Sequence, residues 1–446
     1  MKIQIIDGNV LLPTGLKKVS IELENGLITR IGNRIKEDPL AVKISAAGKY
    51  VLPGFIDLHT NGIAGFDLTN GLFNLEKSTF ISQEDDYLKG LDNALKQFSK
   101  QGTTLVGFTT LEAPINKMKR IFQLIAKYKN ESPSIYKELF HGIYLEGTFM
   151  KDKRFRGAHN PKYFFKPSIQ LFKELQEAAN GNIKIVNVVP EWGDAALELI
   201  EYLATKNIVC AAGHTSATGN QYRAAISKGL TLAIHVLNGP SSSSYKPFDG
   251  GGSLESFLQS DDMFVEIITD GYHVDKSYVL DLIKKKGTEK CVAITDSMFV
   301  TKMKKVKEFQ ISGVKGKVSE NGEYIQIAGR ENDNALFGSV LTMDKAFENL
   351  LNWFTSSVKS VWSDNHESLS LNDAIVNASK MCSANPAKIL GIYFLQNGEV
   401  KKEDNNITGS IELHKSGDIV IADISEHNKK YKIKIEKTLV KGNLID

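Results

Sequence analysis

Eight short apolar runs in the middle of the chain end in polar side chains that can bind metals or transfer protons. The runs occupy residues 55–59, 103–110, 142–146, 183–191, 208–214, 231–235, 264–270 and 292–296. Their last residues are His59, Thr110, Glu146, Glu191, His214, His235, Asp270 and Asp296. A buried polar group without a partner is costly, so eight in the same position are difficult to explain by packing. The pattern therefore indicates one shared site.

Three of these residues have the chemistry of a metal site. Glu146 offers a carboxylate, and His214 and His235 offer imidazoles about one strand–helix–strand repeat apart. This set suits zinc or a similar divalent ion and leaves a position open for water. His214 alone would more often be a structural histidine, but the three together favour a metal.

Asp296 ends the last run, where a carboxylate would face the metal. It could accept a proton from water and later return the proton to a leaving group. The alternative is an N-cap for the next helix, a position that aspartate also favours.

The stretch VLPGFIDLHTNG, residues 51–62, carries His59 and then Asn61. Many metal-dependent hydrolases have a second histidine at the latter position. The amide oxygen of asparagine is a weaker ligand than an imidazole nitrogen. We therefore expect one tightly held metal with His59 as a weak ligand, and a weak second metal remains open.

The elements that position these residues follow from the pattern of the middle segment. The runs are nearly continuous and rich in Val and Ile, which is typical of parallel strands buried on both faces. Between them lie helical stripes such as Leu197, Ile200 and Leu203. Eight strand–helix units predict an α/β fold, a (β/α)8 TIM barrel whose strand ends meet at one mouth.

Both ends of the chain have a different texture, with alternating apolar residues and turn signals. Asp7-Gly8 and Asn25-Gly26 are typical of hairpins. We expect residues 1–50 and 393–446 to pair into one small β-sandwich domain, with residues 51–392 forming the barrel. The alternative is two unrelated β-extensions.

Composition excludes several classes of function. The chain has 446 residues and a net charge of +3, too small to predict a nucleic-acid partner. A lysine cluster is expected to be a solvated loop or helix face; it contains Lys302, Lys304, Lys305 and Lys307. Three scattered cysteines, no signal-peptide pattern and no run of about 18 apolar residues predict a cytoplasmic protein without a membrane partner.

The chain resembles the amidohydrolase superfamily and, within it, the N-acetylglucosamine-6-phosphate deacetylases. The resemblance covers almost the whole chain. Its motifs are VLPGFIDLHTNG, GIYLEGTF, GAHNP, GHTSAT, HVLN, DGYHV, ITDSM, GSVLTMDKA, NPAKILGI and GSIELHKSGDIVIAD. GHTSAT, GAHNP and GSVLTMD together are fairly specific.

The resemblance implies roles for single residues and an overall reaction. The matching metal ligands are Glu146, His214 and His235, and the matching catalytic residues are Asp296 and the amide-polarising His273. The matching substrate-binding residues are His159, Asn238 and Gly239. His273 and His159 could also be ordinary loop histidines. The resemblance further implies one divalent ion per subunit, zinc or iron, a small-molecule amino sugar phosphate as partner, and a homodimer.

Two departures from the family pattern concern the substrate. The arginine that grips the sugar phosphate in the family is missing from HVLNGPSSSSYKPFDGG, where Lys246 is the basic residue. Lysine binds phosphate as a point charge without a bidentate fork. The usual EGPF also becomes EGTF, with Thr148. N-acetylgalactosamine-6-phosphate or an unphosphorylated sugar therefore stays open beside N-acetylglucosamine-6-phosphate.

The expected reaction is hydrolysis of the N-acetyl group, giving acetate and the free amino sugar. A second hypothesis is a cyclic-amide or amino-acid-amide hydrolase on the same barrel, since fold does not fix function. A third is a silent scaffold, which the presence of all four key residues disfavours.

Overall fold

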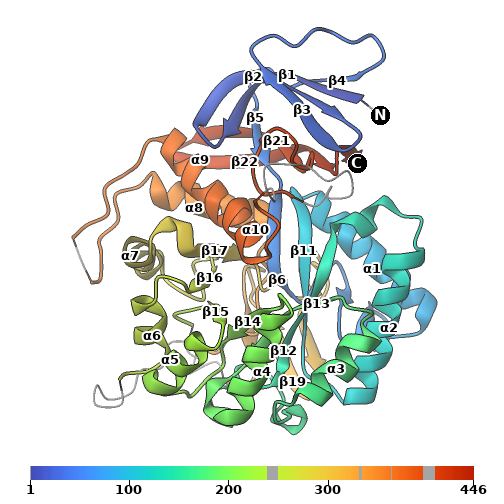
Figure 1. Ribbon diagram of the computed structural model, residues 1–446, viewed down its shortest axis with the longest axis vertical. Helices are drawn as coiled ribbons and strands as arrows, with labels where there is room; N and C mark the ends of the chain where they lie inside the picture. Colours follow the sequence, from blue (N-terminus) through green and yellow to red (C-terminus); the bar gives the residue numbers. More distant parts are fainter. Residues whose placement is uncertain (1, 239–249, 331–333, 363, 395–406, 446) are drawn as a thin grey trace.

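The computed structural model describes residues 2–238, 250–330, 334–362, 364–394 and 407–445 (Figure 1). At its centre lies one sheet of eight strands in the order β17-β16-β15-β14-β13-β12-β11-β6, and neighbouring strands are parallel. The strands are β6 (Phe55–Thr60), β11 (Thr103–Thr110), β12 (Phe140–Phe149), β13 (Ile183–Val188), β14 (Val209–Ala212), β15 (Leu230–Ala233), β16 (Phe264–Ile268) and β17 (Cys291–Ile294). Each corresponds to one predicted apolar run, so the prediction of an α/β fold with eight parallel strands is confirmed.

Helices alternate with these strands and surround them (Figure 1). They are α1 (Glu84–Ser99), α2 (Ile115–Glu131), α3 (Ile169–Ala178), α4 (Asp194–Thr205), α5 (Gly219–Ser227), α6 (Ser253–Gln259), α7 (Lys276–Lys286), α8 (Met343–Phe354), α9 (Leu371–Ser379) and α10 (Asn385–Ile389). In α4 the predicted stripe buries Ile200 and Leu203, whereas Leu197 is partly buried. Among the described residues, no helix is long and apolar enough to cross a lipid bilayer.

Hydrogen bonds join the two edge strands of the parallel sheet. The Asp57 carboxylate of β6 accepts from the hydroxyl of Thr295 at 2.6 Å and from its amide at 3.2 Å. The Asp296 amide donates to the His59 carbonyl at 2.8 Å. The segment after β17 is therefore fixed directly against the end of β6.

Strands from both ends of the chain lie in one second sheet, in the order β23-β22-β21-β5-β1-β2-β3, with β4 beside β1. They are β1 (Lys2–Leu12), β2 (Gly15–Glu24), β3 (Leu27–Gly32), β4 (Val42–Ser45), β5 (Tyr50–Pro53), β21 (Ile419–His427), β22 (Lys430–Val440) and β23 (Asn443–Ile445). Antiparallel pairing of β5 with β21 connects the two ends. Strands from the two ends of the chain therefore share one sheet, in which β5 ends at Pro53.

The two predicted turn signals behave differently. Asn25 has φ = 52° and lies in the tight turn between β2 and β3. Asp7 has φ = 60° but lies inside β1, where the register with β2 shifts between Ile5 and Gly8. The prediction of a hairpin at Asp7-Gly8 was wrong. A β-bulge needs the same left-handed backbone and so gives the same dipeptide signal.

Two small sheets extend the loops after β6 and β17. The first contains β7 (Gly62–Ile63), β8 (Phe66–Asp67), β9 (Gly71–Asn74) and β10 (Thr79–Ile81), and the second contains β18 (Glu308–Ile311), β19 (Val314–Val318) and β20 (Ile325–Ile327). A shared aromatic cluster packs them together, with Phe299 4.8 Å from Phe73 and 5.0 Å from Phe309 between ring centroids. The predicted lysine cluster lies on the exposed loop before β18.

We expect Thr295→Val to lower the free energy of unfolding by about 1–3 kcal/mol, because it removes a donor from a buried carboxylate. Urea unfolding followed by circular dichroism measures this change. An unchanged midpoint would show that the Asp57–Thr295 contact does not secure the edge strands.

Candidate active site

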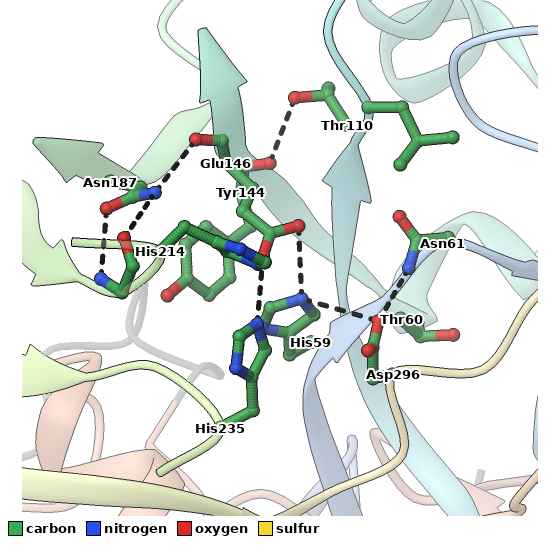
Figure 2. A network of polar contacts seen from close by, with 12 residues as sticks. His59, Thr60, Asn61, Thr110, Tyr144, Glu146, Asn187, His214, His235 and Asp296 are labelled. Carbon is green, nitrogen blue, oxygen red and sulfur yellow. Dashed lines mark hydrogen bonds and ion pairs between the residues drawn. The ribbon is translucent and has the colours of Figure 1, made fainter. Parts of the chain in front are cut away.

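Glu146, His214 and His235 form a buried cluster at the carboxyl ends of strands β12, β14 and β15 (Figure 2). Glu146 lies in β12, and each histidine follows its strand, β14 or β15, by two residues. The Glu146 Oε1 atom lies 3.2 Å from His235 Nε2 and 3.4 Å from His214 Nε2. The structure thus brings together the three predicted metal ligands.

The backbone turns sharply at three site residues. The φ angles are 54° at His214, 25° at His235 and 49° at Asp296, all in the left-handed region. Non-glycine residues held there cost on the order of 1–3 kcal/mol and persist only where the surroundings fix them. At His214 the Asn187 side chain supplies such support, since it joins the Glu146 carbonyl to the Gly213 amide at 3.0 and 3.2 Å.

The protonation of both histidines suits metal binding. The Nδ1 atom of His214 lies 2.8 Å from the Phe155 carbonyl, which can only accept, so Nδ1 carries the proton and Nε2 presents its lone pair. Burial lowers the pKa of His214 and lowers that of His235 to about 3. A carboxylate and two neutral imidazoles fit Zn²⁺ or a similar divalent ion.

His59 faces the same cluster from β6. Its Nδ1 atom lies 3.0 Å from Glu266 Oε2, and its Nε2 atom lies 3.5 Å from Glu146 Oε2 and 3.6 Å from Asp296 Oδ1. Burial alone would lower the pKa of His59, but the charges of Glu146 and Glu266 raise it well above its usual value. His59 therefore lies beside the three ligands. Its partner Glu266 was not predicted from the sequence.

Asp296 lies next to His59 and accepts a hydrogen bond from the Asn61 side chain at 2.7 Å (Figure 2). Burial, together with the charge of Glu146, raises the pKa of its carboxyl group to about 6. No helix begins within residues 297–330, all of which the structure describes, so the alternative of an N-cap was wrong.

His273 and His159 are each held by a carboxylate. His273 Nδ1 lies 2.7 Å from Asp270, and His159 Nδ1 lies 2.5 Å from Glu112. Burial opposes protonation of both rings, but these carboxylates raise both pKa values. Glu112 lies two residues beyond Thr110, where the predicted apolar run ends, so the strand-end pattern did not indicate it.

Not every predicted strand-end residue belongs to the cluster. The Thr110 hydroxyl donates to the Tyr144 carbonyl at 3.4 Å, and Glu191 accepts from Thr215 and Ser216 at 2.5 and 2.9 Å. Thr110 thus bonds the backbone of β12, and Glu191 bonds the loop after β14, rather than the ligand cluster. The expectation that all eight polar ends share one site was therefore too broad.

The cluster lies in a cavity of about 490 Å³. Its lining includes the predicted residues His159, Asn238 and His273, and also Arg154 and Arg330, which sequence reasoning missed. Arg330 follows β20 in the second small sheet, which carried no sequence signal. Gly239 and Lys246 lie outside the described residues.

Comparison with known proteins gives a family and a fold. The sequence profile of the amidohydrolase family matches residues 50–445. The N-acetylglucosamine-6-phosphate deacetylase of Bacillus subtilis strain 168 is 28% identical over 91% of this chain and 89% of its own length. The N-acetylgalactosamine-6-phosphate deacetylase of Escherichia coli O157:H7 is 25% identical over 91% of each. The crystal structure of the N-acetyl-D-glucosamine-6-phosphate deacetylase from Mycobacterium smegmatis matches with a TM-score of 0.77 at 22% identity, covering both chains completely.

We expect Glu146→Gln and His235→Ala to lose most of the zinc that the purified wild type retains through dialysis, because each removes one of three donors. Metal content by mass spectrometry is the measurement, and the exposed Glu177→Gln is the control. Full retention in both site variants would place the metal elsewhere.

Proposed function

The chain belongs to the amidohydrolase family, and we propose that it removes the acetyl group from an N-acetyl amino sugar phosphate, chiefly N-acetylglucosamine-6-phosphate. The observation that carries this proposal is the buried set Glu146, His214 and His235 with Asp296 beside it in one cavity. The relatives named above supply the substrate class. The relative that acts on N-acetylgalactosamine-6-phosphate keeps that epimer as the second candidate.

In this proposal Glu146, His214 and His235 hold one divalent ion, zinc or iron, and His59 is a weak additional ligand. Such an ion polarises a carbonyl and lowers the pKa of water. Asp296 accepts the proton of the attacking water and returns it to the departing nitrogen as the amide C–N bond breaks. Acetate and the free amine result.

The remaining cavity residues bind and orient the substrate. His273, held by Asp270, polarises the amide and stabilises the developing oxyanion. His159 and Asn238 contact the sugar. Its phosphate is bound by Arg330, and Arg154, whose guanidinium also pairs with Asp152, supplies a second cationic group to the cavity. The resemblance implies a role near the phosphate for Gly239, and Lys246 is a further candidate to bind the phosphate as a point charge.

We further propose a closed (β/α)8 barrel, a β-sandwich built from the terminal sheet, a homodimer and a cytoplasmic location. The hydrogen bonds between β6 and the segment after β17 support closure. The dimer is supported by the family resemblance, and the three free buried cysteines fit a reducing compartment.

The experiment that tests the function is release of acetate from both 6-phosphate epimers and their dephosphorylated forms, with and without a chelator. We expect the fastest chelator-sensitive release from N-acetylglucosamine-6-phosphate. No release from any of the four sugars, with hydantoins or N-acyl amino acids hydrolysed instead, would overturn the proposal.

We expect Asp296→Asn to lower kcat by roughly 10²–10⁴-fold while the bound metal stays, since general base catalysis contributes about that much. Steady-state kinetics and metal content on the same sample measure both quantities. A wild-type rate in this variant would show that Asp296 is not the general base.

We expect Arg330→Ala to raise KM for the phosphorylated sugar by about ten- to a hundredfold, since a charge-assisted hydrogen bond contributes about 1.5–3 kcal/mol. KM for the dephosphorylated sugar should not change, and the exposed Arg34→Ala is the control. An equal rise in KM for both sugars would show that Arg330 does not bind the phosphate.

A further inference from the structure

Glu112 is a buried carboxylate next to the cavity-lining His159, and the reaction proposed above gives it no role. It follows β11 by two residues, and both of its oxygens bond to one loop. Its Oε2 atom lies 2.5 Å from His159 Nδ1, and its Oε1 atom accepts from the Asn160 amide at 2.7 Å. One side chain therefore holds both the imidazole and the backbone beside it.

The neighbouring strand leaves room for this carboxylate. Gly147 follows Glu146 in β12, and a Cβ atom at Gly147 would lie only 2.8 Å from the Glu112 amide nitrogen and 3.0 Å from its Oε2 atom. Glycine permits this close approach, which any side chain would prevent. The backbone before Glu112 is also fixed, because the Leu111 amide donates to the Thr69 hydroxyl at 2.9 Å. Rigid elements thus set the position of the carboxylate.

The loop that Glu112 holds has little other support. Residues 156–160, all of which the structure describes, lie in neither a helix nor a strand. The Asn160 side chain donates to the Ser312 carbonyl at 2.7 Å, in the turn between β18 and β19, so the loop lies between Glu112 and the second small sheet. Its residues that line the cavity are Gly157, Ala158 and His159. A shift of this loop would therefore change the shape of the cavity wall.

Glu112 also decides which edge of the His159 ring faces the site. An ionised carboxylate can only accept, so Nδ1 carries a proton and points to Glu112. The opposite atom, His159 Nε2, then lies 3.7 Å from Glu146 Oε2, and the ring packs edge-on against that of His214 with 4.8 Å between centroids. A flipped ring would lose its bond to the carboxylate.

We propose that Glu112 is a positioning residue for substrate binding: its carboxylate orients the His159 ring and fixes the loop of residues 157–161, so that both meet the sugar in one preformed arrangement. Preorganisation of this kind lowers the entropic cost of binding. The role in substrate binding rests on the proposed function. The hold on the loop does not involve the substrate.

Kinetics test the role in substrate binding, with the wild type, Glu112→Gln, His159→Ala and the double variant. Glutamine keeps an oxygen for the Asn160 amide but loses the charge that holds the ring. We expect Glu112→Gln to raise KM for N-acetylglucosamine-6-phosphate roughly tenfold, with kcat and bound zinc unchanged, since a charge-assisted hydrogen bond is about twice as strong as a neutral one. In the His159→Ala background the same change should alter KM less than about twofold, because effects that act through one contact do not add.

Glu22→Gln is the matched control, because Glu22 is also a buried carboxylate but bonds to Gln4 at 2.8 Å in the terminal sheet. Its KM should equal that of the wild type. An unchanged KM in Glu112→Gln, or an equal rise in KM with and without His159, would overturn the role in substrate binding.

Hydrogen exchange followed by mass spectrometry tests the hold on the loop without any substrate. We expect the peptide that contains the Asn160 amide to exchange about tenfold faster in Glu112→Ala than in the wild type, because the variant removes the acceptor of that amide. Glu112→Asp, whose carboxylate is one methylene shorter, replaces the alanine variant if that protein does not fold. An unchanged exchange rate would overturn the hold on the loop. If the wild type hydrolyses none of the acetamido sugars, the proposed function fails, while the exchange rate still decides whether Glu112 fixes the loop.

Discussion

Burying the carboxylate of Glu146 away from water is the physical constraint on which the site depends. A buried carboxylate is stable only with partners that compensate its charge. Here the rings of His214, His235 and His59 lie 3.2–3.5 Å from its oxygens. Burial keeps His214 and His235 neutral, so this arrangement is poised to accept a cation.

Meeting this constraint requires several strands to end at one place. Parallel strands deliver their carboxyl ends to the same edge of the sheet, and left-handed residues after three of them turn the side chains inward. The contacts between β6 and the segment after β17 bring Asp296 to the cluster from the opposite edge of the sheet. The second small sheet, β18–β20, and the segment after it then contribute part of the cavity wall, including Ile327 and Arg330.

The sequence predicted those parts of the molecule that depend on local pattern. All eight parallel strands were found because strands buried on both faces are continuous apolar runs, and Glu146, His214, His235 and Asp296 were found because they end such runs. The small sheet β18-β19-β20 was missed because short strands in a polar insertion carry little periodicity. Glu112 and Glu266 were missed because their role is to hold a histidine that is distant in sequence, which no local pattern encodes. The bulge at Asp7-Gly8 was mistaken for a turn because both need the same backbone conformation.

Crystals grown with zinc, with anomalous diffraction recorded on both sides of the zinc absorption edge, test the central claim most directly. The account predicts one strong anomalous peak within bonding distance of Glu146, His214 and His235, with Asp296 beside it and still bonded to Asn61. A peak at any other group of residues, or these three side chains pointing apart around no ion, would contradict it.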